Sequence, residues 1–243
     1  MPSRLIISSA DTVRRYAQYN ETSYSQFAQA QANQFSTVRT RLPEDGKMLN
    51  LDLTQSDDGT PLSFAGTVLF GGVDSGAAKG IDGAMIITGG PSVVEIRNGQ
   101  AAATPGDVSL VDTDVNNFKA PTLMIGAAWS YFNGQSSLGD SARIYFGYDG
   151  KFHNGAVLGD NATLKAGQVF LVGNDVTVGD GATIDTRGFG DNVIDSDMGY
   201  VYANGLIAGQ TFDNPAILAV GNGRLDFLGS EGAGAITVTA HPC

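Results

Sequence analysis

The chain has 243 residues and a formal net charge of −11, with 14 lysines and arginines against 25 aspartates and glutamates. This acidic balance argues against binding to nucleic acid or to an anionic membrane surface, because both need a basic face. The single cysteine, Cys243, excludes a disulfide within the chain, and no apolar run is long enough for a transmembrane helix. Glycine takes 33 positions, about twice the usual share. Abundant glycine with little lysine favours secreted β-structure over a cytoplasmic enzyme.

Residues 1–46 are predicted to form an N-terminal strand and helix segment. Residues 5–7 read as a short strand, and Ser8 with Asp11 resembles a capping box. The segment 12–35 is predicted to be an amphipathic helix, because its aromatic residues recur at roughly helical spacing and it lacks glycine and proline. We interpret this aromatic stripe as packing rather than as a cofactor site. The start of the chain has too short an apolar run for a signal peptide, so an exported form would be an internal piece of a longer protein.

After the turn at 43–46 the periodicity changes to alternating strands and turns. Alternation of period two is typical of a strand with one buried face. Residues 100–117 are polar and predict turns. The predicted strands are 49–53, 62–70, 84–88, 93–96, 200–202, 216–220, 224–227 and 235–238.

One heptapeptide pattern recurs at a constant spacing, at 138–144, 158–164 and 178–184. A fainter copy lies one period earlier, at 118–124, where lysine and alanine replace the Gly-Asp pair. A fixed period of this size indicates one structural unit stacked on itself, so that equivalent apolar residues form ladders between copies. The ladders would be Leu138/Leu158/Val178, Ala142/Ala162/Ala182 and Ile144/Leu164/Ile184.

These patterns predict an all-β fold, a right-handed parallel β-helix (solenoid) with one N-terminal amphipathic helix. The β-helix would span residues 47–243, with its clear 20-residue repeats over 118–186. A left-handed β-helix acyltransferase is an alternative, because the copy at 158–164 also suits a hexapeptide repeat. Each coil of that type consists of three hexapeptides, which is shorter than the period found here, and this difference favours the right-handed form.

Five segments of the chain resemble large exoproteins of the filamentous-haemagglutinin type. They are RLPEDGK at 41–47, LSFAGT at 62–67, GAMII at 83–87, FKAPTLMIG at 118–126 and GQVFLV at 167–172. The resemblance covers roughly residues 41–190. It implies a β-helical shaft of a Gram-negative adhesin that is exported by two-partner secretion. The family's N-terminal secretion domain has no counterpart here, which fits an internal segment.

Few residues suggest chemistry. His153 and His241 are the only histidines, and each is better interpreted as a loop residue than as a catalytic base. The segment 112–116 has the first three ligand positions of a calcium loop but lacks its glycine and its glutamate. Asp191, Asp195 and Asp197 form a second weak oxygen cluster. Asp74-Ser75-Gly76 matches the aspartic-protease tripeptide, but a second copy is missing. Cys243 has no catalytic partner pattern.

Two further groups have a catalytic or binding alternative. Asp140, Asp160 and Asp180 would form a column of carboxylates, the residue type that carbohydrate-active enzymes use in pairs. A residue that recurs once per coil is more often structural, and we interpret these as turn residues. The aromatic group could stack on sugars, although loop packing is the simpler interpretation. Its members are Trp129, Tyr131, Phe132, Tyr145, Phe146 and Tyr148.

The sequence therefore predicts a structural and binding shaft segment of a secreted or surface-displayed bacterial adhesin, with no chemistry of its own. We expect no catalytic, cofactor-binding or metal-binding residue. The expected partners are a host-cell or bacterial surface receptor or glycan, and an outer-membrane secretion partner for the parent protein. A carbohydrate-active enzyme, either a polysaccharide lyase or a hydrolase, is the alternative function.

Overall fold

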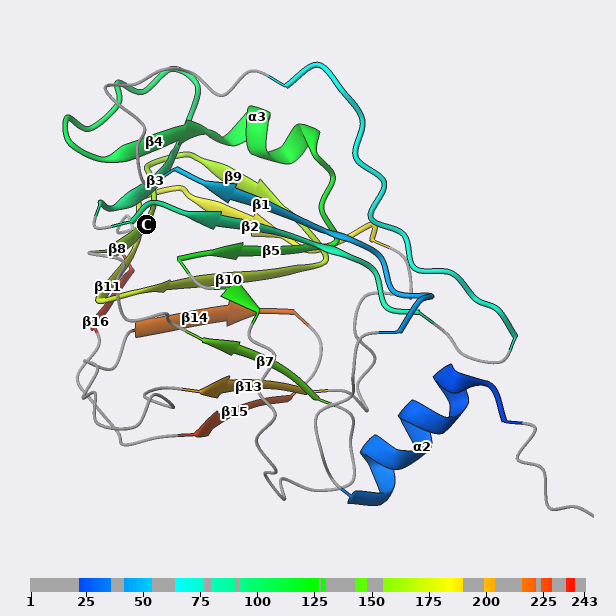
Figure 1. Cartoon of the computed structure of the whole chain (residues 1–243). Coiled ribbons are helices and arrows are strands. Elements are labelled where there is room, and N and C mark those ends of the chain that lie inside the picture. The colour runs from blue at the N-terminus through cyan, green and yellow to red at the C-terminus, as the bar shows by residue number, and fades with distance from the viewer. Residues whose placement is uncertain are drawn as a thin grey trace, which may run out of the picture.

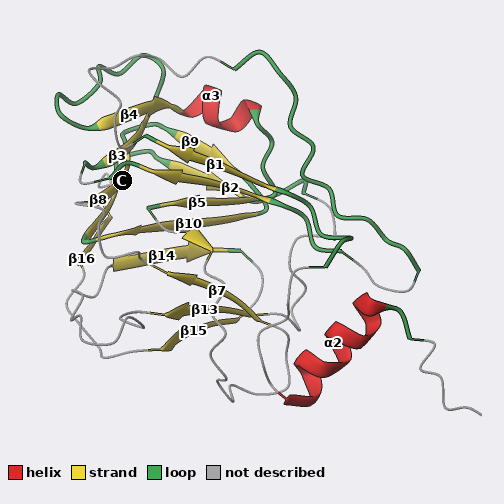
Figure 2. Cartoon of the chain, viewed as in Figure 1, coloured by secondary structure: helices red, strands yellow, loops and turns green. Residues whose placement is uncertain are grey.

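The structure is a computed structural model of the whole chain, drawn in Figure 1. It describes residues 22–35, 42–53, 64–76, 80–90, 92–126, 128–129, 143–147, 155–189, 199–203, 216–221, 224–228 and 235–238. Strands dominate these residues, and they lie one above another in layers (Figure 2).

The first five-stranded sheet has the order β1-β2-β5-β10-β14. Its neighbours are parallel except for β10 and β14, which pair antiparallel. The three central strands are buried along almost their whole length, as expected for apolar runs covered on both faces. The strands are β1 (Met48–Asp52), β2 (Ala84–Thr88), β5 (Thr122–Ile125), β10 (Gln168–Gly173) and β14 (Ala216–Val220).

The second five-stranded sheet has the order β16-β11-β8-β3-β4, and all of its pairs are parallel. Val94 and Ile96 alternate with Glu95 and Arg97 along β3, so one face of this strand carries apolar residues and the other carries charges. The strands are β3 (Val94–Arg97), β4 (Val108–Val111), β8 (Gly155–Leu158), β11 (Asp175–Val178) and β16 (Ala235–Val238).

Two smaller sheets complete the described strands. In the two-stranded sheet, β9 (Thr163–Lys165) pairs in parallel with β12 (Thr183–Asp185). The four-stranded sheet has the order β15-β13-β7-β6 and combines parallel pairs with one antiparallel pair. Its strands are β6 (Ala128–Trp129), β7 (Arg143–Gly147), β13 (Gly199–Ala203) and β15 (Arg224–Leu228).

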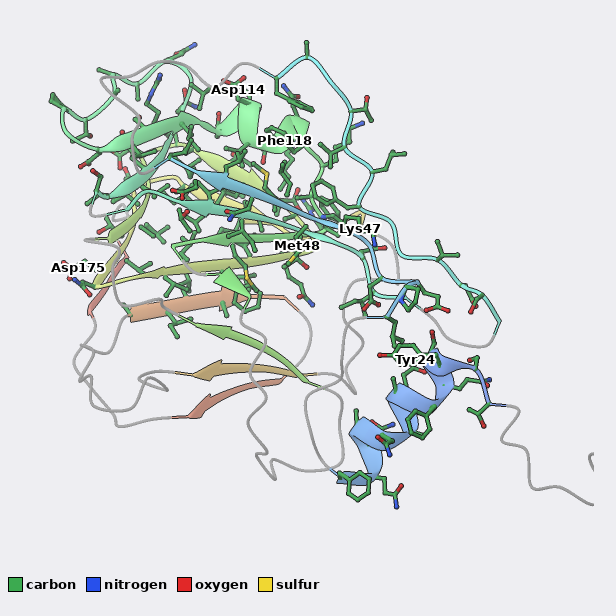
Figure 3. The ribbon with its side chains drawn as sticks, viewed as in Figure 1. Tyr24, Lys47, Met48, Asp114, Phe118 and Asp175 are labelled. Atoms are coloured by element: carbon green, nitrogen blue, oxygen red, sulfur yellow. The ribbon has the colours of Figure 1, made fainter. Side chains whose placement is uncertain are left out.

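The described helices are α2 (Tyr24–Phe35) and α3 (Asp112–Asn117). The predicted helix over 12–35 is confirmed for its second half, and the rest lies outside the described residues. Contrary to the packing interpretation, the side chains of Tyr24, Phe27 and Phe35 are solvent-exposed. Figure 3 shows α2, with Tyr24 labelled, at the side of the molecule away from the stacked strands.

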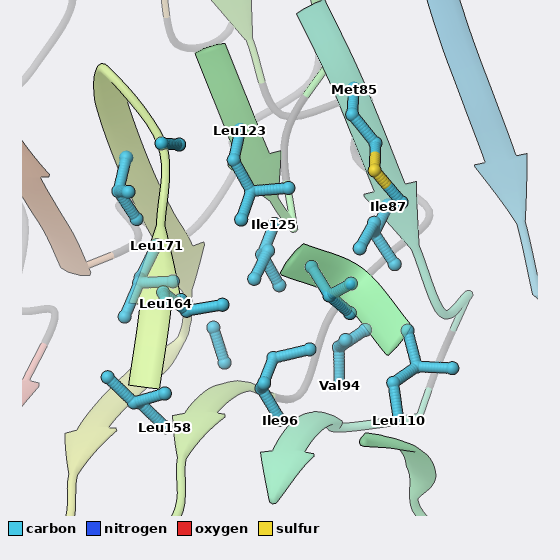
Figure 4. Packing of buried hydrophobic residues seen from close by; sticks show 14 of the residues in the cluster. Met85, Ile87, Val94, Ile96, Leu110, Leu123, Ile125, Leu158, Leu164 and Leu171 are labelled. Atoms are coloured by element: carbon cyan, nitrogen blue, oxygen red, sulfur yellow. The ribbon is translucent and has the colours of Figure 1, made fainter. Parts of the chain in front are cut away.

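The main core lies between the two five-stranded sheets and β9 (Figure 4). The first sheet contributes Met85 and Leu123, which are opposite each other in the register, and Leu171, which is opposite Ile125. The second sheet contributes Ile96 and Leu158, and Leu164 of β9 joins them. All of these side chains are at most 1% exposed. Burial of this apolar surface is the main stabilising contribution to such a fold.

The 20-residue ladder is confirmed only between the second and third copies. Leu158 pairs with Val178, and Leu164 pairs with Ile184. The first copy does not join them, because Ile144 of β7 pairs with Tyr200 of β13 in another sheet. The prediction that the fainter copy at 118–124 joins the ladder is also wrong, since Thr122 pairs with Ala84 and Gln168.

The predicted fold class, an all-β right-handed parallel β-helix, is therefore wrong. The described strands fall into four separate sheets that contain both parallel and antiparallel pairs, and helices accompany them. The physical reason is that the 20-residue spacing governs a single step, whereas the other paired strands are joined by connections of different lengths. The left-handed alternative is abandoned with it, and a division of the chain at residues 46 and 47 remains a prediction.

Most individual strand predictions are confirmed, with two errors. Residues 64–70 of the predicted strand 62–70 are in no strand. Residues 100–117, which were expected to be turns, contain β4 and α3. Residues 64–70 are mostly exposed and pair with no strand in the described part of the chain, whereas tertiary contacts impose β4 and α3 on the polar residues of 100–117.

Candidate functional site

A network of polar side chains covers the outer face of β3 and β4. Glu95 is opposite Ser109 in the register and is only 9% exposed. Three donors reach its carboxylate: the Ser109 hydroxyl at 2.6 Å, the Thr104 hydroxyl at 2.8 Å and the Thr104 backbone N–H at 3.1 Å. Such charge-assisted hydrogen bonds compensate for the burial of the carboxylate.

Arg97 extends the same network towards the loop between β3 and β4. Its Nε donates to the Ser109 hydroxyl at 3.1 Å, and its Nη1 donates to the carbonyl oxygen of Ala101 at 2.6 Å. Arg97 and Glu95 therefore hold the loop 98–107 against the sheet at Ala101 and Thr104, respectively.

Asp107 is the second acid of this region. Burial, followed by the negative charge of Glu95, raises the pKa of the Asp107 carboxyl above its ordinary value. A carboxyl with a raised pKa next to a carboxylate is the arrangement that an acid–base pair requires. We call Glu95, Arg97, Thr104, Asp107 and Ser109 the β3–β4 carboxylate site.

The geometry of the β3–β4 carboxylate site limits its chemistry. A general base must have a lone pair that can reach a substrate proton. The two oxygens of Glu95 already accept three hydrogen bonds, two from Thr104 in the following loop and one from Ser109 on the neighbouring strand β4. The site is thus built to fix a loop. Sequence reasoning missed it, although a Glu and an Arg two residues apart on an otherwise apolar strand were a visible signal.

Asp160, from the predicted column of aspartates, makes a structural contact. Its Oδ1 accepts the backbone N–H of Asp180 at 2.8 Å, which ties two successive turns together. The turn of the second copy contains Asn161 at φ 55°, and Gly181 occupies the equivalent position at φ 66°. Glycine and asparagine are the residue types that adopt this left-handed conformation most readily. Asp140 lies outside the described residues.

An exposed ion pair lies directly after the third copy of the repeat. The Arg187 guanidinium lies 2.7 Å from the Asp185 carboxylate and lowers the pKa of Asp185 to about 2. Because Asp185 ends β12 and Arg187 lies in the turn that follows, the pair orders this turn rather than forming a site for a ligand.

The segment that resembles a calcium loop is helix α3. Its Asp112 and Asn116 side chains bind the backbone of β9 instead of converging on a cation position. Among the residues that the structure describes, no group of three or more histidine, cysteine, aspartate or glutamate side chains is placed to hold a metal. The second candidate cluster, Asp191, Asp195 and Asp197, lies outside these residues.

The protease-like tripeptide is a local turn. Asp74 Oδ1 accepts the Gly76 N–H at 2.8 Å, and the Ser75 hydroxyl donates to Glu44 Oε1 at 3.3 Å. The Ser25 hydroxyl of α2 donates to the other oxygen of Glu44 at 2.6 Å, and this bond is the main cause that lowers the pKa of Glu44. Glu44 therefore connects α2 with the loop 73–76.

The remaining predicted residues are described in part or not at all. His153, His241, Cys243, Tyr131, Phe132 and Tyr148 lie outside the described residues. The backbone register places Trp129 opposite Phe146, and Phe146 opposite Tyr202. The register places Tyr145 opposite Val201, at a position that alternates with that of Phe146. The choice between packing and sugar stacking remains a prediction.

The comparisons with known proteins found no relative. No family model, no curated protein and no solved structure matches the chain. In the part of the chain that the structure describes, no helix has the length and apolarity needed to cross a membrane.

Proposed function

We propose that this chain is a structural and binding segment of a secreted or surface-displayed bacterial adhesin, without chemistry of its own. The observation that carries the proposal is the hydrogen bond from the Asp180 N–H to Asp160 Oδ1, because it gives a structural role to the acid that recurs in the repeat. Glu95, Asp112 and Asp45 are used in the same way, since each accepts backbone N–H groups of distant or local segments.

The proposed partners are a host-cell or bacterial surface receptor or glycan, and an outer-membrane secretion partner for the parent protein. The resemblance of residues 41–190 to filamentous-haemagglutinin-type exoproteins supports this choice. The acidic charge and the high glycine content are in keeping with it.

A carbohydrate-active enzyme is the second candidate, and one observation favours it. In the β3–β4 carboxylate site, the raised pKa of Asp107 beside Glu95 resembles the division of roles between an acid and a base. Against it, three donors already occupy the Glu95 carboxylate.

The two candidates are separated by one set of measurements on the purified full chain. It is incubated with acidic and neutral polysaccharides, and new reducing or unsaturated ends are measured for the wild type, Asp107→Asn and Asp160→Asn. The adhesin proposal expects no release of ends by any of the three proteins, together with binding of the wild type on a glycan array. Release that Asp107→Asn abolishes and Asp160→Asn preserves would establish the enzyme instead.

A further inference from the structure

The edge of β9 that faces away from β12 presents three backbone groups. In a parallel pair, alternate residues of a strand direct their N–H and C=O groups to opposite edges. The Thr183 N–H of β12 donates to the Ala162 carbonyl at 2.9 Å, so the N–H and C=O of Thr163 and the N–H of Lys165 belong to the other edge. An uncovered edge of this kind is a template on which another strand can pair.

Helix α3 covers this edge with side chains rather than with a strand. Asp112 Oδ2 accepts the Thr163 N–H at 2.9 Å. The carboxamide of Asn116 makes two bonds, because its Nδ2 donates to the Thr163 carbonyl at 2.7 Å and its Oδ1 accepts the Lys165 N–H at 2.8 Å. Figure 2 shows α3 lying across the top of the layer that contains β9.

The Asn116 carboxamide imitates the N–H and C=O groups of one residue in a parallel neighbour. A residue in such a neighbour donates its N–H to one carbonyl and accepts the N–H two residues further along. Asn116 donates to the carbonyl of Thr163 and accepts from Lys165, which is the same pattern around Leu164. One side chain thereby takes the place of a strand residue and ends the ladder.

Helix α3 lies at the edge of β9 where the repeat predicts the strand of a further copy. The third copy pairs with the second through β12 and β9, and the first copy was expected to continue the ladder on the opposite edge. The first copy instead contributes β7 to the four-stranded sheet, and α3 occupies the free edge. A strand of the repeat type therefore fits this edge in sequence and register, but α3 excludes it.

We propose that α3 is an edge cap that prevents β9 from pairing with a strand of a second copy of this chain. The matching strand is β12, which already pairs in register with the opposite edge of β9. Pairing of β9 in one molecule with β12 in the next is a head-to-tail contact that does not close, so its product grows into chains of molecules. The cap keeps the copies separate.

The test compares two substitutions of the same chemistry on neighbouring residues. Asn116→Ala releases the Thr163 carbonyl and the Lys165 N–H, whereas Asn117→Ala removes an exposed asparagine from the same helix without touching β9. Sedimentation velocity of the full chain is measured over a series of concentrations. We expect the average mass of Asn116→Ala to rise with concentration well above that of Asn117→Ala.

A third variant separates strand pairing from a loss of stability. Proline is tolerated at an edge position whose N–H faces outward, and it cannot donate to a new strand. Asn116→Ala combined with Lys165→Pro should therefore sediment like Asn117→Ala. Equal masses for Asn116→Ala and Asn117→Ala at every concentration would overturn the proposal. Association of the double variant to the same extent as Asn116→Ala would overturn it as well, because exposed core rather than the edge of β9 would then be responsible.

Discussion

Ala162 and Thr163 are adjacent in the chain, but their surroundings differ sharply. Ala162 is fully buried in the main core, whereas the Thr163 side chain is half-buried and only its backbone is held by α3. We predict that Ala162→Leu costs about 1–3 kcal/mol in the free energy of unfolding because it overpacks the core. Thr163→Leu should cost less. Urea unfolding of both variants measures the difference, and equal costs would mean that the assigned inside and outside faces are wrong.

Asp107 should make stability depend on pH in a direction opposite to that of most acids. Its folded pKa is raised, so folding favours the protonated carboxyl. The free energy of unfolding therefore falls as the pH rises from the ordinary value of 3.8 to the folded value, and it stays lower above that range. Asparagine at position 107 imitates the protonated carboxyl, because its side chain is neutral and has a similar shape.

We predict that Asp107→Asn is more stable than the wild type near neutral pH and that the two proteins converge in acid. Urea unfolding at several pH values tests this, with Asp175→Asn as a control on an exposed strand position. A difference between Asp107→Asn and the wild type that persists unchanged in acid would show that the charge is not its cause.

At the scale of single elements, two phenylalanines define the contrast between α2 and α3. Phe35 at the end of α2 is 59% exposed, whereas Phe118 directly after α3 is 4% exposed and stacks on Phe64 with ring centroids 4.7 Å apart. Phe118→Ala should cost about 3–5 kcal/mol. Phe35→Ala should change stability by less than about 0.5 kcal/mol, since alanine is also a good helix former. Thermal or urea unfolding of the matched pair decides this, and a large cost for Phe35→Ala would mean that α2 packs through its aromatic face.

The elements also show how far the sequence could predict the structure. The alternating run 49–53 and the continuous apolar run 84–88 correspond closely to strands, because both patterns are local. The pairing of copies two and three could be predicted because their columns match residue by residue. The place of the first copy could not be predicted, because no local pattern indicates that Ile144 pairs with Tyr200, which is far away in the sequence. The acids at 112 and 114 resemble a calcium loop, but the hydrogen bonds from α3 to β9 join residues far apart in the sequence, beyond the reach of any local pattern.

The same limit applies to the β3–β4 carboxylate site. Glu95 and Arg97 are visible in the sequence, but their partners Thr104 and Ser109 are ordinary polar residues in a stretch that reads as turns. Only the register that places Glu95 opposite Ser109 brings these residues together.

At the scale of the whole molecule, close backbone contacts join residues 42–47 to residues 70–83. A Cβ atom added at Gly83 would collide with the Lys47 carbonyl oxygen, whereas one added at Gly71 would meet no heavy atom within 4 Å. The buried carboxylate of Asp45 adds to this junction by accepting the backbone N–H groups of Leu42 and Ile81.

We predict that Gly83→Ala destabilises the molecule by at least about 1–3 kcal/mol, since backbone must move to admit the new methyl group. Gly71→Ala should be close to neutral. Urea unfolding of the two variants beside the wild type measures both effects. A neutral Gly83→Ala would contradict the close contact between these segments.

The pairing distances along the chain imply an order of assembly during folding. The register joins Thr163 to Thr183 across a single repeat, Thr122 to Gln168 across a longer stretch, and Asp175 to Ala235 across the longest of the three. Closing the longest of these loops costs about 1 kcal/mol more chain entropy than closing the shortest. Of these three pairings, the one within the unit 155–185 should therefore form first, that of the central strands of the first sheet should follow, and β16 should join last. A molecule built from such distant partners is expected to fold slowly compared with a helical bundle of the same length.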